Sequence, residues 1–154
     1  MLSNLSNRSL VGLFLLFLTT VFFILLIRND EPLRGAERMP TGLLYSVWYH
    51  DVAQCAQLPE LGYYDIEWYV IPDVLSFKTS IGEKVGLWER NGKYSRITIA
   101  GAYAYDEMVV KHEMLHHLLN VGGHPPLYFE DRCQLTWKTW AANHHPIMTT
   151  KETP

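Results

Sequence analysis

The N-terminal part of the chain carries an uninterrupted apolar run, from Leu10 to Ile27, with no charged residue in 18 positions. At a rise of about 1.5 Å per residue, a helix of this length reaches roughly 27 Å, which is enough to cross the hydrocarbon core of a bilayer. A buried helix of a soluble domain is seldom uncharged on every face over such a length. The run therefore predicts a transmembrane helix over residues 10–28, preceded by a short tail over residues 1–9.

The residues after this run indicate how the segment is used. Arg28 to Pro32 is charged and polar, and the boundary has no small-x-small cleavage site, which favours a retained anchor over a cleaved signal peptide. Basic residues are nearly balanced on the two sides, and we expect a cytoplasmic N-terminus with the following domain on the extracytoplasmic side. Residues 29–41 contain two prolines, a glycine and scattered charges, and they predict a linker.

The charge of the remaining chain excludes one class of partner. Without residues 1–28, 126 residues remain with 11 basic and 16 acidic side chains, a net charge of −5. A nucleic acid held through its phosphates is therefore not expected. This segment is long enough to bury a core, and it contains all five tryptophans and all nine tyrosines.

Cys55 and Cys133 are the only two cysteines, and they lie 78 positions apart. A CxxC metal knuckle is therefore excluded. In an extracytoplasmic domain the two can form a disulfide, which closes a long loop and stabilises the fold by roughly 4 kcal/mol in the chain-entropy model. Two free buried thiols are the alternative.

Periodicity predicts an α+β order of elements in the domain. Leu44, Trp48, Val52 and Cys55 form a helical stripe, which prolines and glycines bring to an end near position 59. Residues 66–71 are rich in β-branched and aromatic side chains and predict a strand.

A hairpin is predicted next. Asn91-Gly92 lies between two strand-like runs, 85–90 and 93–100, and this dipeptide favours a two-residue turn. With that turn Trp88 faces Ser95, and residues 66–100 form a small antiparallel or mixed sheet. Asp106 is then a candidate N-cap for a helix over residues 107–119, which a pair of glycines and a pair of prolines end.

The predicted helix contains the pattern H-E-x-x-H, at His112, Glu113 and His116. Two histidines four residues apart lie on one helix face, so both imidazoles can reach a single zinc ion at about 2.0–2.1 Å. Glu113 lies beside that face, where it can act as a general base toward water without binding the metal. An amphipathic helix with solvated histidines is the alternative, and the apolar neighbours of the motif disfavour it.

With a small sheet before it, this helix resembles the active-site helix of the zincin metallopeptidases. The match comprises His112, Glu113, His116 and the strand-then-helix order, over about residues 65–130. The resemblance implies that the two histidines bind catalytic zinc, that Glu113 activates water, and that the strand before the helix holds the substrate in β fashion. Small bacterial proteins predicted to be metallopeptidases are similar overall.

At the position of the third zinc ligand, this sequence differs from the common zincin patterns. A strict metzincin would have glycine at position 119 and histidine at position 122, where this chain has Leu119 and Gly122. His124 follows the glycine pair after the helix, and a reversal there can bring its ring back to the metal. A gluzincin-like arrangement would instead use an acid from a later helix, Glu130 or Asp131. We favour His124, with Glu130 as the main alternative.

Other polar residues near the motif have supporting roles in this interpretation. His117 lies about 100° around the helix from His116, so it points to the surface or supports the site without sharing the metal. Tyr103, Tyr105 and Tyr128 are candidate donors to an oxyanion, although each also fits a core or interface role.

Residues 42–154 are thus predicted to form an α+β, zincin-like catalytic domain, tethered to a membrane by one N-terminal helix. The predicted activity is zinc-dependent hydrolysis of peptide bonds in a protein or peptide substrate. The alternatives are a non-catalytic metal-binding module and a protein-interaction module without metal.

Overall fold

The computed structural model describes residues 12–21, 31–60 and 62–144, and the chain divides into two units, residues 1–32 and 33–154. In the first unit, residues 12–21 are helical. Within the described ranges, no helix combines the length and the apolar character that crossing a membrane requires. The predicted span over residues 10–28 extends beyond the described residues at both ends, and it stays a prediction.

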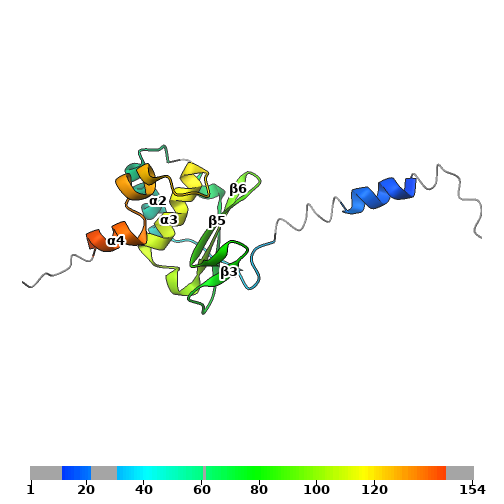
Figure 1. The fold of residues 1–154 in the computed structure, drawn as a ribbon, viewed down its shortest axis with the longest axis horizontal. Helices are drawn as coiled ribbons and strands as arrows, with labels where there is room; N and C mark the ends of the chain where they lie inside the picture. The colour runs from blue at the N-terminus through cyan, green and yellow to red at the C-terminus, as the bar shows by residue number, and fades with distance from the viewer. Residues whose placement is uncertain (1–11, 22–30, 61, 145–154) are drawn as a thin grey trace, which may run out of the picture. The chain divides into compact units, whose positions relative to one another are not determined.

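The second unit is an α+β domain with a small mixed sheet (Figure 1). Four strands form this sheet in the order β1-β2-β6-β5, namely β1 (Glu37–Arg38), β2 (Ile66–Ile71), β6 (Tyr94–Ala100) and β5 (Gly86–Asn91). A separate hairpin consists of β3 (Phe77–Thr79) and β4 (Gly82–Lys84). The helices are α2 (Leu43–Ala56), α3 (Glu107–Leu119) and α4 (Trp137–His144), with short turns η1 (Tyr63–Asp65) and η2 (Gly101–Tyr103) and the π-helical segment η3 (Leu127–Arg132).

The central pair of the sheet is parallel. β2 pairs with β6 in parallel, whereas β1 pairs with β2 and β5 pairs with β6 in antiparallel fashion. A parallel pair needs a long crossover, and residues 72–93 supply it with the β3–β4 hairpin and β5. The sheet over residues 66–100 is therefore mixed, and β1 lies within the stretch predicted as a linker.

The β5–β6 hairpin forms as predicted, but its turn lies one residue further along. Asn91 pairs with Tyr94, so the turn residues are Gly92 and Lys93. Gly92 has a φ of 61°, as expected for glycine at the first central position of a two-residue turn. Trp88 consequently pairs with Ile97 and not with Ser95. Because the partner moves by two positions, Trp88 keeps the face that was predicted.

The helices begin and end close to their predicted bounds. The Asp106 carboxylate caps α3 by accepting a hydrogen bond from the Val109 N–H at 3.0 Å. Asn120, with a φ of 53°, ends α3 before the glycine pair is reached. In α2, Trp48 and Val52 are buried as the stripe predicts, while Leu44 is 46% exposed.

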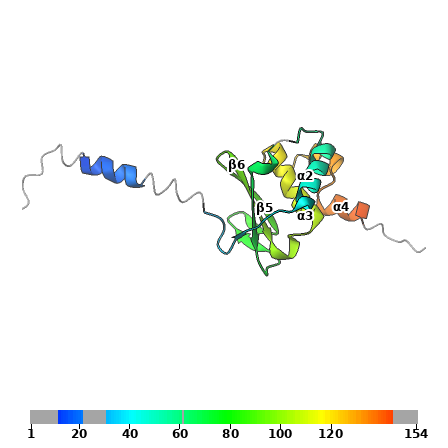
Figure 2. The same cartoon turned by 180° about the vertical axis from the view of Figure 1, so that it is seen from behind.

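The core lies between the sheet and the α2–α3 pair, which both views place on one side of the sheet (Figures 1 and 2). Its largest fully buried side chains come from α2, β6, α3 and η3, and include Tyr45, Tyr49, Ile97, Ile99, Met114, Leu115 and Phe129. This packing fixes one side of α3 and leaves another side for the site.

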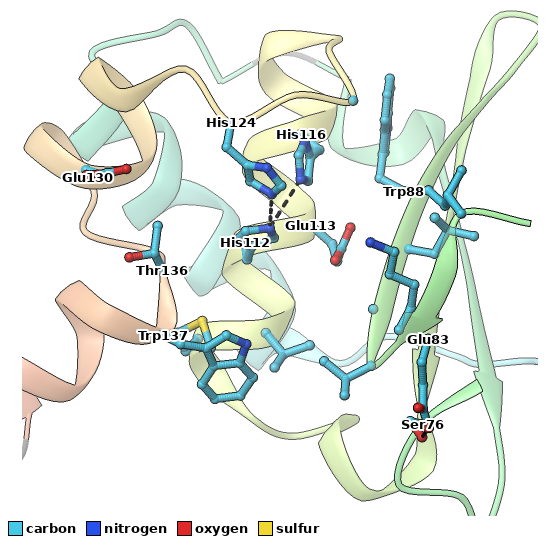
Figure 3. Close-up of a pocket in the computed structure, with 18 residues that line it drawn as sticks. Ser76, Glu83, Trp88, His112, Glu113, His116, His124, Glu130, Thr136 and Trp137 are labelled. Carbon is cyan, nitrogen blue, oxygen red and sulfur yellow. Dashed lines mark hydrogen bonds between the residues drawn. The ribbon is translucent and has the colours of Figure 1, made fainter. Parts of the chain in front are cut away.

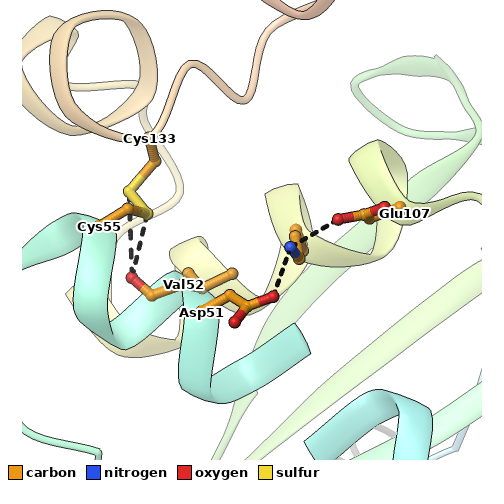
Figure 4. A network of polar contacts seen from close by, with 6 residues as sticks. Asp51, Val52, Cys55, Glu107 and Cys133 are labelled. Carbon is orange, nitrogen blue, oxygen red and sulfur yellow. Dashed lines mark hydrogen bonds and ion pairs between the residues drawn. A yellow bond between two sulfur atoms is a disulfide. The ribbon is translucent and has the colours of Figure 1, made fainter. Parts of the chain in front are cut away.

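Covalent and ionic contacts tie the helices together (Figure 4). The predicted disulfide between Cys55 and Cys133 is confirmed, and it joins the end of α2 to the residue after η3. The Lys111 ammonium group of α3 lies 2.9 Å from the Asp51 carboxylate of α2 and 2.6 Å from the Glu107 carboxylate. These links hold η3 and both helices as one block.

Candidate metal centre

Three histidine side chains converge in front of helix α3 (Figure 3). His112 and His116 lie one turn apart on α3, and their Nε2 atoms are 3.2 Å apart. His124, from the loop after the helix, places its Nε2 atom 2.9 Å from that of His112. One ligand atom from each residue lies within 4.8 Å of the other two, so this group could hold a metal ion.

Backbone carbonyls orient the two helix rings. The Nδ1 atom of His112 lies 2.6 Å from the Leu135 carbonyl oxygen, and the Nδ1 atom of His116 lies 2.8 Å from the Val121 carbonyl oxygen. A carbonyl oxygen only accepts, so in each ring Nδ1 carries the hydrogen and a neutral ring has its lone pair on Nε2. Two such lone pairs facing each other at 3.2 Å repel unless a cation lies between them. Metal-binding histidines have this arrangement of outer contacts.

The surroundings keep the rings neutral. Burial lowers the pKa of His112 and of His116 to about 4, and it also lowers the pKa of His124. The fully buried Phe129 ring packs against all three imidazoles, with centroid distances of 4.9, 4.8 and 4.8 Å. Neutral imidazole is the form that binds a metal, so the apolar backing favours coordination.

Glu113 extends from α3 toward strand β5 (Figure 3). Its side chain is buried, and its carboxylate accepts a hydrogen bond from the backbone N–H of Trp88. Burial raises the pKa of Glu113 to about 8, while the hydrogen bond from Trp88 and the charge of Lys84 act in the opposite direction. A divalent cation bound nearby would also favour the ionised carboxylate.

The space for Glu113 depends on a glycine in the facing strand. A Cβ atom on Gly86 would lie 2.6 Å from Oε1 and 2.9 Å from Cγ of Glu113. Any larger residue at position 86 would collide with the carboxylate. An isolated glycine within a strand pattern often marks such a close approach, and this was the signal available in the sequence.

The three histidines and Glu113 share one cavity of about 840 Å³. The residues that line it come from β4, β5 and their flanking turns, from α3 and the loop after it, from η3 and from the start of α4. They are Ser76, Ile81, Glu83, Lys84, Val85, Gly86, Leu87, Trp88, Met108, Val109, His112, Glu113, His116, Gly122, His124, Glu130, Thr136 and Trp137. The cavity therefore lies between a helix wall, which we define as His112, Glu113 and His116, and a strand wall, defined as Lys84, Gly86 and Trp88.

The edge of the sheet at this cavity is β5. The strand before the helix, β6, was expected to hold the substrate, but it is paired on both sides, with β2 and β5. The Ala100 N–H donates to the Val85 carbonyl at 2.8 Å, so in alternation Leu87 and Glu89 bond to β6. The peptide groups of Gly86 and Trp88 then point to the outer edge of the described sheet.

The other candidates from the sequence do not belong to the histidine group. Glu130 lines the cavity from η3 but is exposed and does not belong to the histidine group, and Asp131 is absent from both the lining and the group as described. None of Tyr103, Tyr105 and Tyr128 is among the described lining residues.

His117 supports the structure next to the centre. Its Nδ1 atom lies 2.7 Å from Ser95 Oγ, which also accepts a hydrogen bond from Trp88 Nε1 at 2.9 Å. The Trp88 ring in turn stacks on His116, with centroids 6.2 Å apart and planes 15° apart. His117 thus points away from the three converging rings and joins β5 and β6 to α3.

No family model matches this chain, and no curated protein or solved structure matches it either. The functional interpretation therefore depends on the residues and their geometry.

Proposed function

We propose that residues 33–154 form a zincin-like zinc metallopeptidase domain that hydrolyses peptide bonds, anchored to a membrane by the N-terminal segment. One observation carries the proposal, which is the convergence of three imidazole nitrogens beside a buried glutamate in a single open cavity. The H-E-x-x-H spacing and the order of sheet and helix support it as well.

The donor set fits zinc. Three neutral imidazoles suit zinc among the divalent ions, and three protein ligands leave a coordination position for water or substrate, as catalytic sites require. Among the described residues the histidine group has three members, and neither Glu130 nor another acid closes it. When bound, zinc supplies Lewis acidity, which polarises a carbonyl and promotes the deprotonation of water.

The residues of the chain then have distinct roles. His112, His116 and His124 would hold the ion, with the carbonyls of Leu135 and Val121 fixing the two helix rings. Glu113 takes a proton as a water oxygen bonds to the carbonyl carbon and the carbonyl electron pair moves to its oxygen. When that pair re-forms the carbonyl and the C–N bond breaks, Glu113 returns the proton to the leaving amine.

The edge strand supports a peptide as the substrate. The outward peptide groups of Gly86 and the outward carbonyl of Trp88, whose N–H is bonded to Glu113, can pair with an extended chain, which adds a strand to the sheet beside the histidines. If the N-terminal segment anchors the protein, as predicted, substrates would be proteins near the bilayer surface.

Glu113→Gln tests the proposal on the full-length, zinc-loaded protein. The amide keeps the size of the side chain but cannot accept the proton, so we expect bound zinc near one equivalent and at least a 100-fold loss of hydrolysis of a peptide library, about the contribution of one general base. Glu107→Gln, on the exposed first turn of the same helix, is the matched control and should retain both properties.

Two results would contradict the proposal. Less than about half an equivalent of metal in the parent protein would remove the basis for catalysis. Retained metal with equal behaviour of the parent and E113Q toward all peptides would instead indicate a binding module.

A further inference from the structure

Lys84 occupies the strand wall at the end of β4, where it is half-buried and lines the cavity. The Cβ direction of Gly86 points at Glu113, and Lys84 and Trp88 flank that glycine at positions two before and two after. Trp88 stacks on His116. Lys84 therefore lines the same cavity as Glu113 and the three histidines, from the strand side and not from α3.

The positive charge of Lys84 acts on every functional group of the centre. It lowers the pKa of each of the three histidines and also that of Glu113. No ion pair within 4 Å is found for Lys84 among the described residues. The neighbouring acid, Glu83, accepts a hydrogen bond from the Ser76 hydroxyl.

A positively charged side chain at this place repels a metal cation and so weakens metal binding. We therefore expect it to contribute to another step of the function. Of the described lining residues, Lys84 is the only basic side chain besides the histidines, and the lining contains no tyrosine. The tyrosines expected to stabilise an oxyanion are therefore not in position. An ammonium group in the lining of the cavity would supply positive charge close to the reacting carbonyl.

We propose that Lys84 is the anion-binding residue of the site, whose ammonium group stabilises the negative charge on the carbonyl oxygen when water adds to the peptide bond. This inference rests on the proposed function. Lys84 neither gains nor loses a proton in the step, since Glu113 takes the proton and the electron pair stays on the oxygen until the C–N bond breaks.

A binding measurement tests this role without turnover. Zinc-loaded full-length protein is titrated by calorimetry with a peptide phosphonate, a tetrahedral anion, and with imidazole, a neutral metal ligand. We expect Lys84→Met to raise the Kd of the phosphonate at least about tenfold with the Kd of imidazole unchanged, and Lys84→Arg to restore most of the affinity. Lys78→Met, on the exposed side of β3, removes the same charge and should change neither value.

Two binding results would overturn the proposal. Phosphonate affinity in K84M equal to that of the parent would show that the charge is not used. An equal loss of affinity for both probes would show that Lys84 only maintains the metal site.

Kinetics separates this role from recognition of a substrate carboxylate. K84M should lower kcat by about 10²- to 10³-fold, with KM changed less than about threefold. A rise in KM restricted to peptides with a free C-terminal carboxylate, and not their amides, would overturn the proposal. If the parent protein cleaves no peptide, the proposed function fails, whereas the phosphonate titration still decides the role of Lys84.

Discussion

The helix wall and the strand wall meet at one cavity but are held in place differently. His112 and His116 lie one helical turn apart, and carbonyls from the segment after the helix fix their rings. The strand wall depends on the pairing of β5 with β6 and on the contact of Gly86 with Glu113. Variants of the helix ligands should therefore act mainly on metal binding, and variants of the strand wall mainly on hydrolysis.

The adjacent histidines His116 and His117 provide the strongest test of whether the helix ligands act mainly on metal binding. His116→Gln removes one of three ligands, and we expect zinc affinity to fall by about 10³-fold, roughly a third of the binding free energy of a typical zinc site. His117→Gln keeps a polar group near Ser95 and should leave the Kd for zinc within about threefold. Competition with a chromogenic chelator measures both. Equal losses in the two variants would mean that the site is not built on the face of α3 that carries His112 and His116.

The disulfide tests how far the helix wall depends on the segment that follows it. Cys133 lies two residues before Leu135, whose carbonyl holds His112. Replacing both cysteines by alanine opens a loop with a sequence separation of 78, and should lower the free energy of unfolding by about 2–4 kcal/mol. Zinc affinity should also fall, by about tenfold, because the carbonyl is less firmly placed.

Urea unfolding followed by tryptophan fluorescence measures the first effect, and chelator competition measures the second. Unchanged stability together with unchanged zinc affinity would show that η3 is held by packing alone.

The difference between the helix wall and the strand wall also explains which parts of the site can be predicted from the sequence. The sequence predicts the positions of His112, Glu113 and His116 because helical spacing brings all three together within one element. Asp106, as the N-cap, marks where that helix begins. His124 could only be favoured over Glu130, because the path of the loop after α3 is not a local property. Asn120 in the left-handed conformation begins that reversal, and the Val121 N–H bonds back to the His116 carbonyl, whereas neither Gly122 nor Gly123 is among the residues described with a positive φ.

Local sequence patterns do not predict which residues form the strand wall. Lys84 ends β4 and Gly86 begins β5, and nothing in the local sequence says that Glu113 lies opposite. The Asn-Gly signal predicts the hairpin, but the turn at Gly92-Lys93 moves the partner of Trp88 by two positions. The parallel pairing of β2 with β6 likewise cannot be predicted from the sequence. A crossover connection and a simple antiparallel meander have the same pattern of strands along the chain.

Gly86→Ala tests the contact between the two walls. The added Cβ would lie 2.6 Å from the Glu113 carboxylate and must displace it, so we expect kcat/KM to fall by about 100-fold and the free energy of unfolding by about 1–3 kcal/mol. Zinc affinity should change much less than in H116Q, because no ligand is touched.

A double-mutant cycle identifies the cause. In a Glu113→Ala background the same glycine substitution should have little effect on stability, because the colliding side chain is absent. A loss of stability as large as in the parent would assign the effect to the strand itself, and the proposed contact between the walls would then be wrong.

The smallest expected effect concerns the hydrogen bonds that link Trp88 of the strand wall to His117 of α3 through Ser95. Ser95 is buried, and its hydroxyl joins the Trp88 indole to His117. Ser95→Ala leaves both partners without this contact, and should lower the free energy of unfolding by about 1–2 kcal/mol. Thr98 lies on the same strand, fully buried, and its Oγ1 atom has no hydrogen-bond partner in the described structure.

Thr98→Val is therefore the matched control, because it removes a buried hydroxyl that makes no hydrogen bond and keeps nearly the same shape. We expect it to be neutral or slightly stabilising, since an unsatisfied buried polar group costs about 1–3 kcal/mol. Urea unfolding of the two variants gives the comparison directly. If T98V is as destabilised as S95A, then any change on β6 disturbs the core, and the Trp88–Ser95–His117 link has no separate role. If S95A alone is destabilised and also lowers kcat slightly with zinc affinity intact, the link positions the strand wall against α3.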